Sequence, residues 1–132
     1  MTARLDVLVV GAGPAGATAA RALAMAGARV RLIDRARFPR NKPCGGAISM
    51  RAIGRFPYLA AALDRVPTHH ISRLHLEGPG GGSVLLRSAT PAALMIRRVE
   101  FDDLLVRLAQ EAGAELCEGC PLYTSPSPRD TR

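Results

Sequence analysis

Three glycines near the start of the chain have the spacing that suits the binding of a phosphate group. The segment GAGPAG places Gly11, Gly13 and Gly16 in the pattern glycine–x–glycine–x–x–glycine. Gly11 is expected to allow a tight turn, Gly13 the approach of a diphosphate, and Gly16 the close packing of a helix on a strand. Pro14 and Ala15 would begin that helix, whose free N–H groups attract an anion.

The glycine pattern is common in proteins, so its surroundings decide between a ligand site and a plain turn. The segment follows an apolar strand and opens a helix, and Asp34 stands at the end of a second strand. A carboxylate at that position accepts hydrogen bonds from a ribose diol and disfavours a 2′-phosphate. These residues predict a dinucleotide site. FAD and NAD share this turn, so the first 34 residues leave the choice of dinucleotide open.

Other residues that can do chemistry form weaker patterns. Cys117 and Cys120 make C-x-x-C, but they follow a strand, whereas a redox dithiol opens a helix that lowers a thiol pKa. His69 and His75 would share one face of a strand at a separation of about 20 Å, with His70 on the other face. We therefore predict no redox dithiol and no metal site.

A βαβ unit is expected to position the glycine-rich turn. Residues 5–10 predict a buried strand, because valine and leucine dominate the run. A helix is expected from Pro14 to about residue 26, where Gly27 ends it. Residues 29–34 predict a second strand, parallel to the first and reached by a right-handed crossover. The expected fold class is therefore α/β, with a Rossmann-like domain.

The middle of the chain predicts a loop, a short helix and a hairpin. Residues 35–47 form a long loop, and Ser49 is expected to cap a helix that continues to about residue 55. Residues 71–77 and 83–87 predict two strands of a β-hairpin, because GPGGG joins them.

The last third predicts a strand, a long helix and a return to the sheet. Residues 94–99 predict a strand, and an apolar stripe from Phe101 to Ala112 predicts the clearest helix. Asp102 and Asp103 suit its first turn, where acidic side chains favour the helix dipole. Gly113 would end this helix, and residues 114–117 would form another strand.

Composition narrows the classes of partner. The chain is 48% hydrophobic and 22% charged, which is typical of a globular domain. Its net charge is +7, and every basic residue except Lys42 is arginine, which favours phosphates, anionic cofactors or an anionic membrane surface. Aromatic residues make up only 4%, so no nucleic acid is expected as a partner. Three cysteines are too few for a secreted disulfide scaffold, which predicts a cytoplasmic location.

Two further segments resemble the geranylgeranyl reductase family of FAD-dependent oxidoreductases. DRARFPRNKPCGGAIS, residues 34–49, carries the more specific part of the resemblance. The start of RRVEFDDLLVRLAQEAGAEL, residues 97–116, is shared with the larger group that includes aromatic hydroxylases and flavin halogenases. The resemblance covers residues 5–119. It implies a Rossmann-like FAD-binding domain, cut short, with the start of an inserted β-rich substrate domain.

The resemblance also implies a role for each matching residue. The residues that would wrap the FAD pyrophosphate are Gly11, Gly13, Pro14, Ala15 and Gly16. Asp34 would hold the adenosine ribose, and Arg35 would lie beside the adenine. The residues placed near the ribityl chain and the flavin ring are Lys42, Cys44, Gly45 and Gly46. Arg98, placed before a helix, would point back toward the polar chain of the flavin, and Cys44 is the one candidate for a catalytic role.

By resemblance, the full enzyme would take electrons from NAD(P)H onto FAD and reduce carbon–carbon double bonds of an isoprenoid lipid. The basic segment 29–42 would allow peripheral contact with a membrane. A flavin monooxygenase or halogenase acting on an aromatic substrate is the alternative within the same fold. A non-catalytic dinucleotide-binding module is the alternative outside the enzymes.

The end of the chain differs from the rest. We expect residues 1–119 to be the N-terminal part of the FAD-binding domain, with a β-hairpin region at about 70–99. Residues 120–132 are expected to be a non-native or disordered tail, because LYTSPSPRD resembles the translation of a sequencing adapter. The glycine–aspartate motif with which this family contacts the flavin a second time is not among the 132 residues. We therefore expect the chain alone to be inactive.

Overall fold

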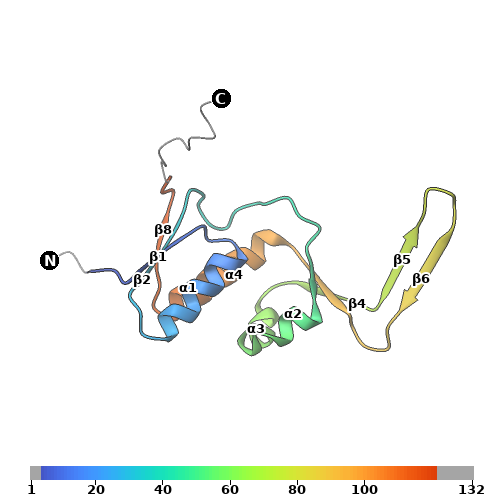
Figure 1. Cartoon of the computed structure of the whole chain (residues 1–132), viewed down its shortest axis with the longest axis horizontal. Helices are drawn as coiled ribbons and strands as arrows, with labels where there is room; N and C mark the ends of the chain where they lie inside the picture. Colours follow the sequence, from blue (N-terminus) through green and yellow to red (C-terminus); the bar gives the residue numbers. More distant parts are fainter. Residues whose placement is uncertain (1–3, 122–132) are drawn as a thin grey trace, which may run out of the picture. The chain divides into compact units, whose positions relative to one another are not determined.

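The computed structural model describes residues 4–121, which form two compact units (Figure 1). The first unit comprises Met1–Arg40 and Leu105–Arg132, and the second comprises Asn41–Leu104. Each unit has its own β-structure. Among the described residues, no helix combines the length and the apolar character needed to cross a membrane.

The first unit is a parallel three-stranded sheet with a crossover helix. Its elements are β1 (Val7–Val10), α1 (Pro14–Met25), β2 (Val30–Asp34) and β8 (Glu115–Glu118). The strand order is β1-β2-β8, so β2 pairs with a parallel strand on each side. The α/β, Rossmann-like fold predicted from the sequence is confirmed, including the return of the chain to the sheet as β8.

Small residues bring α1 close to the sheet. Helix α1 packs on β1 and β2, and its side chains Ala17 and Ala20 are fully buried. Gly27 follows the helix in the left-handed region, with φ of +89°, as expected of a glycine that ends a helix. This packing holds the N-terminus of α1 at the carboxyl end of β1.

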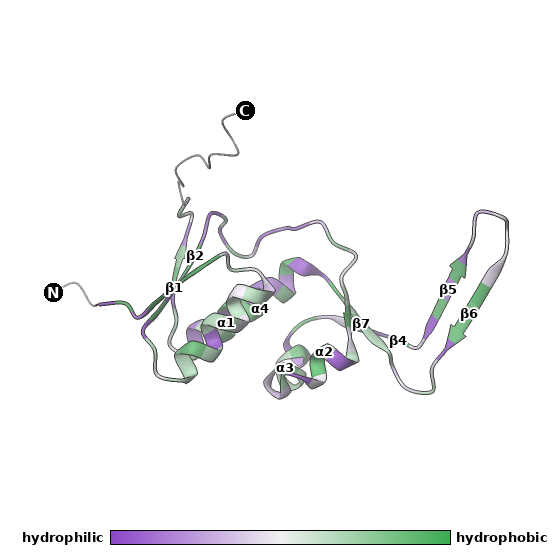
Figure 2. Ribbon diagram, viewed as in Figure 1, coloured by the Kyte–Doolittle hydropathy of each residue, from purple (hydrophilic) through white to green (hydrophobic). Residues whose placement is uncertain are grey.

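Strand β1 is less buried than its sequence predicts. Leu8 and Val10 are 51% and 60% exposed, whereas Val9 faces the helix. Successive side chains of a strand point to opposite faces, so the described residues cover one face of β1 and leave the other open. The prediction of a strand buried on both faces is therefore wrong for this chain, although its residues are strongly apolar (Figure 2).

Helix α4 (Arg98–Glu111) belongs to both units, because the boundary between the units falls within it. The predicted apolar stripe is buried except at Ala112, which is half-buried. Asp102 and Val106, which the stripe does not include, are buried as well. The helix begins at Arg98, earlier than predicted, and the preceding strand β7 (Ala93–Ile96) ends before residue 99. The reason is that Phe101 donates its N–H to the carbonyl of Arg97 at 3.0 Å, which closes a helical turn there.

The second unit contains a three-stranded antiparallel sheet and two short helices. Strand β7 lies between β3 (Ala47–Ser49) and β4 (Thr68–Ile71). The helices are α2 (Met50–Gly54) and α3 (Pro57–Ala62), followed by a 3₁₀ turn (Leu63–Arg65). Ser49 caps α2 as predicted, because its Oγ accepts the N–H of Ala52 at 3.2 Å. The sequence did not predict β3, α3 or β4.

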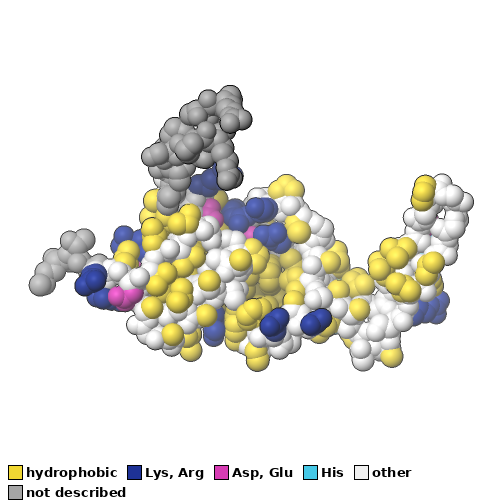
Figure 3. Space-filling model, viewed as in Figure 1, with side chains coloured by type: hydrophobic (Ala, Val, Ile, Leu, Met, Phe, Trp, Pro, Cys, Tyr) yellow, Lys and Arg dark blue, Asp and Glu magenta, His cyan; other side chains and the backbone are white. Residues whose placement is uncertain are grey.

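The predicted hairpin is present as β5 (Arg73–Glu77) and β6 (Ser83–Arg87). The strand predicted over residues 71–77 is interrupted at Ser72, so His69 lies in β4 and His75 in β5, in different sheets. The expectation that these two histidines share a strand face is therefore wrong. Apolar side chains gather on the hairpin surface (Figure 3). Those that are about half exposed are Leu74, Leu76, Val84, Leu85 and Leu86.

The segment LYTSPSPRD, on which the expectation of a non-native or disordered tail rests, lies outside the described residues.

Candidate functional site

The glycine-rich turn has the geometry that its spacing predicts. Gly11 adopts φ of +94°, and its N–H donates to the carbonyl of Ile33 at 2.8 Å, which ties the turn to β2. A side chain at Gly16 would overlap the carbonyl oxygen of Gly11. The first turn of α1 therefore packs directly on the turn, as expected of the third glycine.

The start of α1 presents backbone N–H groups rather than a side-chain cap. Gly13 is the N-cap and is extended, and in the described part of the chain no side chain accepts a hydrogen bond at this end. Pro14 occupies the first helical position. The N–H groups of Ala15 and Gly16 have no partner within the helix, because the first turn lacks preceding carbonyls. Such groups, at the positive end of the helix dipole, attract an anion.

Asp34 joins the end of β2 to the same turn. Its Oδ2 accepts the N–H of Ala12 at 2.7 Å, and its Oδ1 accepts the N–H of Ala36 at 2.8 Å. Each carboxylate oxygen can accept a further hydrogen bond, so the group remains able to receive a hydroxyl. The two backbone bonds orient the carboxylate before any ligand arrives.

A cavity of about 270 Å³ opens beside Asp34 in the first unit. Its walls are formed by Val10, Gly11, Ile33, Asp34, Arg35 and Cys120. It lies at the carboxyl ends of β1 and β2, where open α/β sheets bind their ligands. Three residues that the sequence singled out, Gly11, Asp34 and Arg35, are thus brought together. The sequence did not predict the presence of Cys120 there; its N–H donates to the carbonyl of Asp34 at 2.9 Å.

The thiols of the pair Cys117 and Cys120 lack the lowered pKa that a redox dithiol needs. A hydrogen bond between the two side chains raises the pKa of the Cys117 thiol, with burial contributing in the same direction. Redox dithiols need the opposite shift, because the thiolate is the reactive form. The geometry gives no support for thiol chemistry at this position.

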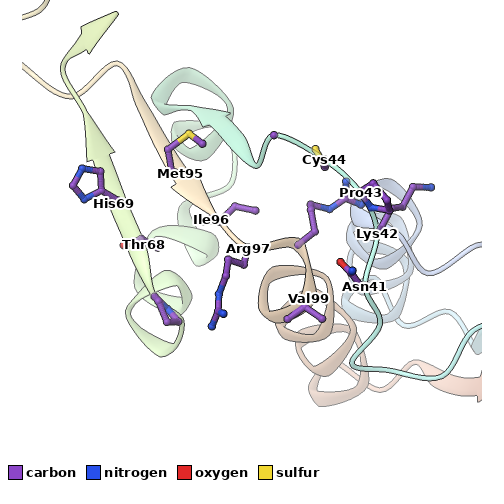
Figure 4. A pocket seen from close by; sticks show the side chains of 13 residues that line it. Asn41, Lys42, Pro43, Cys44, Thr68, His69, Met95, Ile96, Arg97 and Val99 are labelled. Atoms are coloured by element: carbon purple, nitrogen blue, oxygen red, sulfur yellow. The ribbon is translucent and has the colours of Figure 1, made fainter.

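A larger cavity, of about 860 Å³, lies in the second unit (Figure 4). Four of the predicted flavin-side residues line it: Lys42, Cys44, Gly45 and Arg98. Thr68 and His69 enter from β4, and Met95 enters from β7. The wall thus combines cations with apolar side chains.

Gly46 has a different position from the other four. It is buried against β7, where its carbonyl accepts the N–H of Ile96 at 2.9 Å. A side chain at Gly46 would overlap the carbonyl oxygen of Ile96, and φ is +76°. The packing of the loop on β7 therefore accounts for this glycine.

Arg98 connects Cys44 to a buried carboxylate. The Nε and Nη2 atoms of Arg98 donate to the two oxygens of Asp102 at 2.7 and 2.9 Å, which raises the pKa of the guanidinium. The Gly46 N–H, 3.5 Å from the Cys44 sulfur, lowers the pKa of that thiol, and the Arg98 guanidinium adds to the effect. Arg98 was expected before the helix, but it is the first residue of α4. From its place in the first turn, Asp102 was expected only to favour the helix dipole; its spacing of four residues from Arg98 was the available signal for the ion pair.

Neither cavity is built as a metal site. Among residues 4–121, no three side chains of the types His, Cys, Asp and Glu lie close enough together to hold a metal ion. The groups that are present, namely backbone N–H donors, an oriented carboxylate and arginines, fit the phosphates and ribose of a dinucleotide.

Comparison with known proteins gives the same assignment. The family described as FAD binding domain matches residues 4–123. The chain is 39% identical over 119 residues to a menaquinone reductase of Mycobacterium tuberculosis, covering 86% of this chain and 29% of that protein. It is 39% identical over 116 residues to a geranylgeranyl diphosphate reductase of Rhodobacter capsulatus, covering 88% of this chain and 28% of that protein.

Two solved structures are similar in fold and in sequence. A geranylgeranyl bacteriochlorophyll reductase-like protein of Thermoplasma acidophilum aligns with a TM-score of 0.70 and 26% identity, over 87% of this chain and 30% of that one. A flavin-dependent brominase aligns with a TM-score of 0.68 and 27% identity, over 86% of this chain and 29% of that one. The chain thus spans less than a third of the length of these relatives. The resemblance found in the sequence is confirmed, and the chain belongs to the FAD binding domain family.

Proposed function

We propose that this chain is the FAD-binding front portion of a reductase that acts on carbon–carbon double bonds of an isoprenoid lipid. The observation that carries the proposal is the arrangement of Asp34 at the glycine-rich turn. There an oriented carboxylate, free helix N–H groups and a cavity occur together in one unit. Two phosphates and a ribose need this set of groups.

In this proposal the first unit binds the adenosine diphosphate part of FAD. Gly11, Gly13, Pro14, Ala15 and Gly16 hold the pyrophosphate through the turn and the start of α1. Asp34 accepts hydrogen bonds from the ribose, and Arg35 lies at the adenine side of the small cavity. The pre-oriented carboxylate lowers the entropy cost of binding, because it needs no rearrangement.

Within the second unit, the residues that the resemblance assigns to the ribityl chain and the flavin line a cavity of their own. Lys42 and Arg98 supply cations for polar groups of the ribityl chain, and Gly45 supplies backbone without a side chain. Gly46 holds the loop against β7. Cys44 lines this cavity, and the Gly46 N–H and the Arg98 guanidinium both favour its thiolate. When bound, the flavin supplies two-electron transfer. Cys44 shapes the approach of the substrate and is the one candidate for a direct chemical role.

The relatives narrow the substrate class. The two reductases are named for menaquinone and for geranylgeranyl diphosphate, both of which carry an isoprenoid chain. NAD(P)H is the proposed electron donor, and the cytoplasm, with peripheral contact at a membrane, is the proposed location. The excess of arginine supports contact with anionic lipids or with phosphates.

A flavin halogenase or monooxygenase is the second candidate, because the brominase shares the fold at comparable identity. Anaerobic spectroscopy of the complete gene product that carries this chain separates the candidates. Bleaching of the flavin by NADPH, followed by reoxidation with geranylgeranyl diphosphate or menaquinone, supports the reductase. Reoxidation only by dioxygen, with an aromatic product, supports the second candidate. No bleaching by NADPH or by any other electron donor would leave a binding module and contradict both.

A further inference from the structure

One face of the β5–β6 hairpin is apolar and open to solvent. Every residue of the two strands is exposed. The register pairs Leu74 with Leu86 and Leu76 with Val84, so these four side chains form one apolar face. Each of them is about half exposed, and the turn GPGGG that joins the strands carries no charge. A two-stranded hairpin is only marginally stable by itself, so covering this face would stabilise it.

Two arginines stand at the end of the hairpin that is farthest from its turn. Arg73 begins β5, Arg87 ends β6, and the two are directly opposite each other in the register. Both are exposed, and within residues 4–121 neither forms an ion pair. The one acidic residue of the hairpin, Glu77, lies beside His75 instead. Like charges directly opposite each other destabilise a strand pair, so an anion that contacts both arginines would be stabilising.

We propose that this hairpin docks on an anionic lipid bilayer. The apolar face lies at the boundary between head groups and acyl chains, and Arg73 and Arg87 bind the lipid phosphates. Arginine side chains are long enough to keep their charge among the head groups while their stems lie along apolar neighbours. An apolar face combined with cations is the pattern of elements that lie in a membrane interface. The inference rests on the proposed function, in which the substrate is an isoprenoid lipid, and it names the surface that meets the membrane.

The charges favour a bilayer over a second copy of this chain as the partner of the apolar face. Two hairpins packed on each other would bring the unpaired arginines of both copies to one interface, and each chain has a net charge of +7. Repulsion between such charges opposes self-association. An anionic bilayer attracts the same charges, and the apolar side chains that gather on the hairpin (Figure 3) add to the binding.

The hairpin offers a matched control for its own apolar face. Leu86 and Leu85 are neighbours in β6 and are 51% and 48% exposed. Leu86 lies on the apolar face, whereas Leu85 lies on the opposite face, where its register partner is His75. Leu86→Ser and Leu85→Ser thus remove the same apolar group from opposite faces. Arg55, an exposed arginine of the same unit outside the hairpin, is the control for Arg87, because both changes to Gln alter the net charge equally.

The test measures co-sedimentation of the whole chain with vesicles of phosphatidylcholine mixed with phosphatidylglycerol, and with vesicles of phosphatidylcholine alone. Wild type should bind the anionic vesicles more tightly than the neutral ones. We expect Leu86→Ser to weaken binding to anionic vesicles about tenfold, and Arg87→Gln about fivefold. Leu85→Ser and Arg55→Gln should bind as wild type does. Thermal unfolding checks that each variant is folded, and Leu76→Ser repeats the test at a second position of the apolar face.

Four results would overturn the proposal. If wild type does not bind anionic vesicles, or if Leu86→Ser loses no more affinity than Leu85→Ser, the apolar face does not meet lipid. If ultracentrifugation shows a wild-type dimer that Leu86→Ser dissociates, the face joins two copies instead. If Leu86→Ser weakens vesicle binding of this chain but not of the complete gene product, the remainder of that protein covers the face. A chain that docks on vesicles but does not bind FAD contradicts the proposed function and leaves the hairpin's role in place.

Discussion

The carboxylate of Asp102 is completely buried, and both of its oxygens accept hydrogen bonds from Arg98, one helical turn earlier. These two hydrogen bonds use two of the three nitrogens of the Arg98 guanidinium. The remaining donors are available to Cys44 and to the large cavity. Asp102 thus positions a cation that the motif by itself would assign to cofactor contact.

Replacing one partner of this pair should be strongly destabilising. Asp102→Ala leaves a partly buried guanidinium without its counter-ion, and we expect a loss of about 3–5 kcal/mol in the free energy of unfolding. The double variant Arg98→Met/Asp102→Leu removes both charges and should recover most of that loss. Urea unfolding of wild type, Asp102→Ala and the double variant measures how much stability is recovered when both charges are removed. A double variant no more stable than Asp102→Ala would show that the pair does not act as a unit.

Gly16→Ala should destabilise the first unit, because the new methyl group would overlap the carbonyl of Gly11. Overpacking of this kind costs about 1–3 kcal/mol. Gly54→Ala is the matched control, since a Cβ there meets no atom within 4 Å and the position is helical. Thermal unfolding of the two variants checks the prediction, which fails if both melt at the temperature of wild type.

Asp34→Asn should weaken binding of both ADP and adenosine. The amide can accept the N–H of one of the two backbone donors, but its NH₂ would face the other, so the side chain loses its orientation as well as its charge. We expect affinity for both ligands to fall about tenfold or more. Calorimetric titration of each ligand measures the loss. Asp64→Asn, at an exposed position in the second unit, is the control and should bind both ligands normally.

Cys44 and Cys117 should titrate at different pH. The N–H of Gly46 and the guanidinium of Arg98 lower the pKa of Cys44, so its thiolate appears below the ordinary pH of about 8.5. The side-chain hydrogen bond between Cys117 and Cys120 raises the pKa of Cys117, so its thiolate appears above that pH. Alkylation by iodoacetamide, followed at each cysteine by mass spectrometry, gives the pH midpoint for each thiol. A midpoint for Cys44 at or above that of Cys117 would contradict this account of the cavity.

The first unit was largely predictable from the sequence, because local rules determine it. The glycine spacing, Pro14 at the start of α1 and Gly27 at its end all act within a few residues. The exposed face of β1 was not predictable, since apolar residues alone do not show which elements cover a sheet. An apolar run indicates burial in the complete fold, and this chain spans less than a third of its relatives.

The second unit was less predictable, because its short strands depend on distant partners. Residues 47–49 and 68–71 form strands only through pairing with β7, more than 20 residues away in the chain. The burial of Asp102 was hidden, because an acidic residue in the first turn of a helix is ordinarily a surface residue.

The central claim is that this chain binds the adenosine diphosphate part of FAD. The most direct measurement is a titration of FAD into the purified chain, followed by fluorescence, with ADP and FMN as competitors. We predict saturable binding of FAD that ADP displaces and FMN does not, because FMN lacks the adenosine part held at Asp34 and the glycine-rich turn. Displacement by FMN as readily as by ADP, or no saturable binding of FAD, would contradict the account.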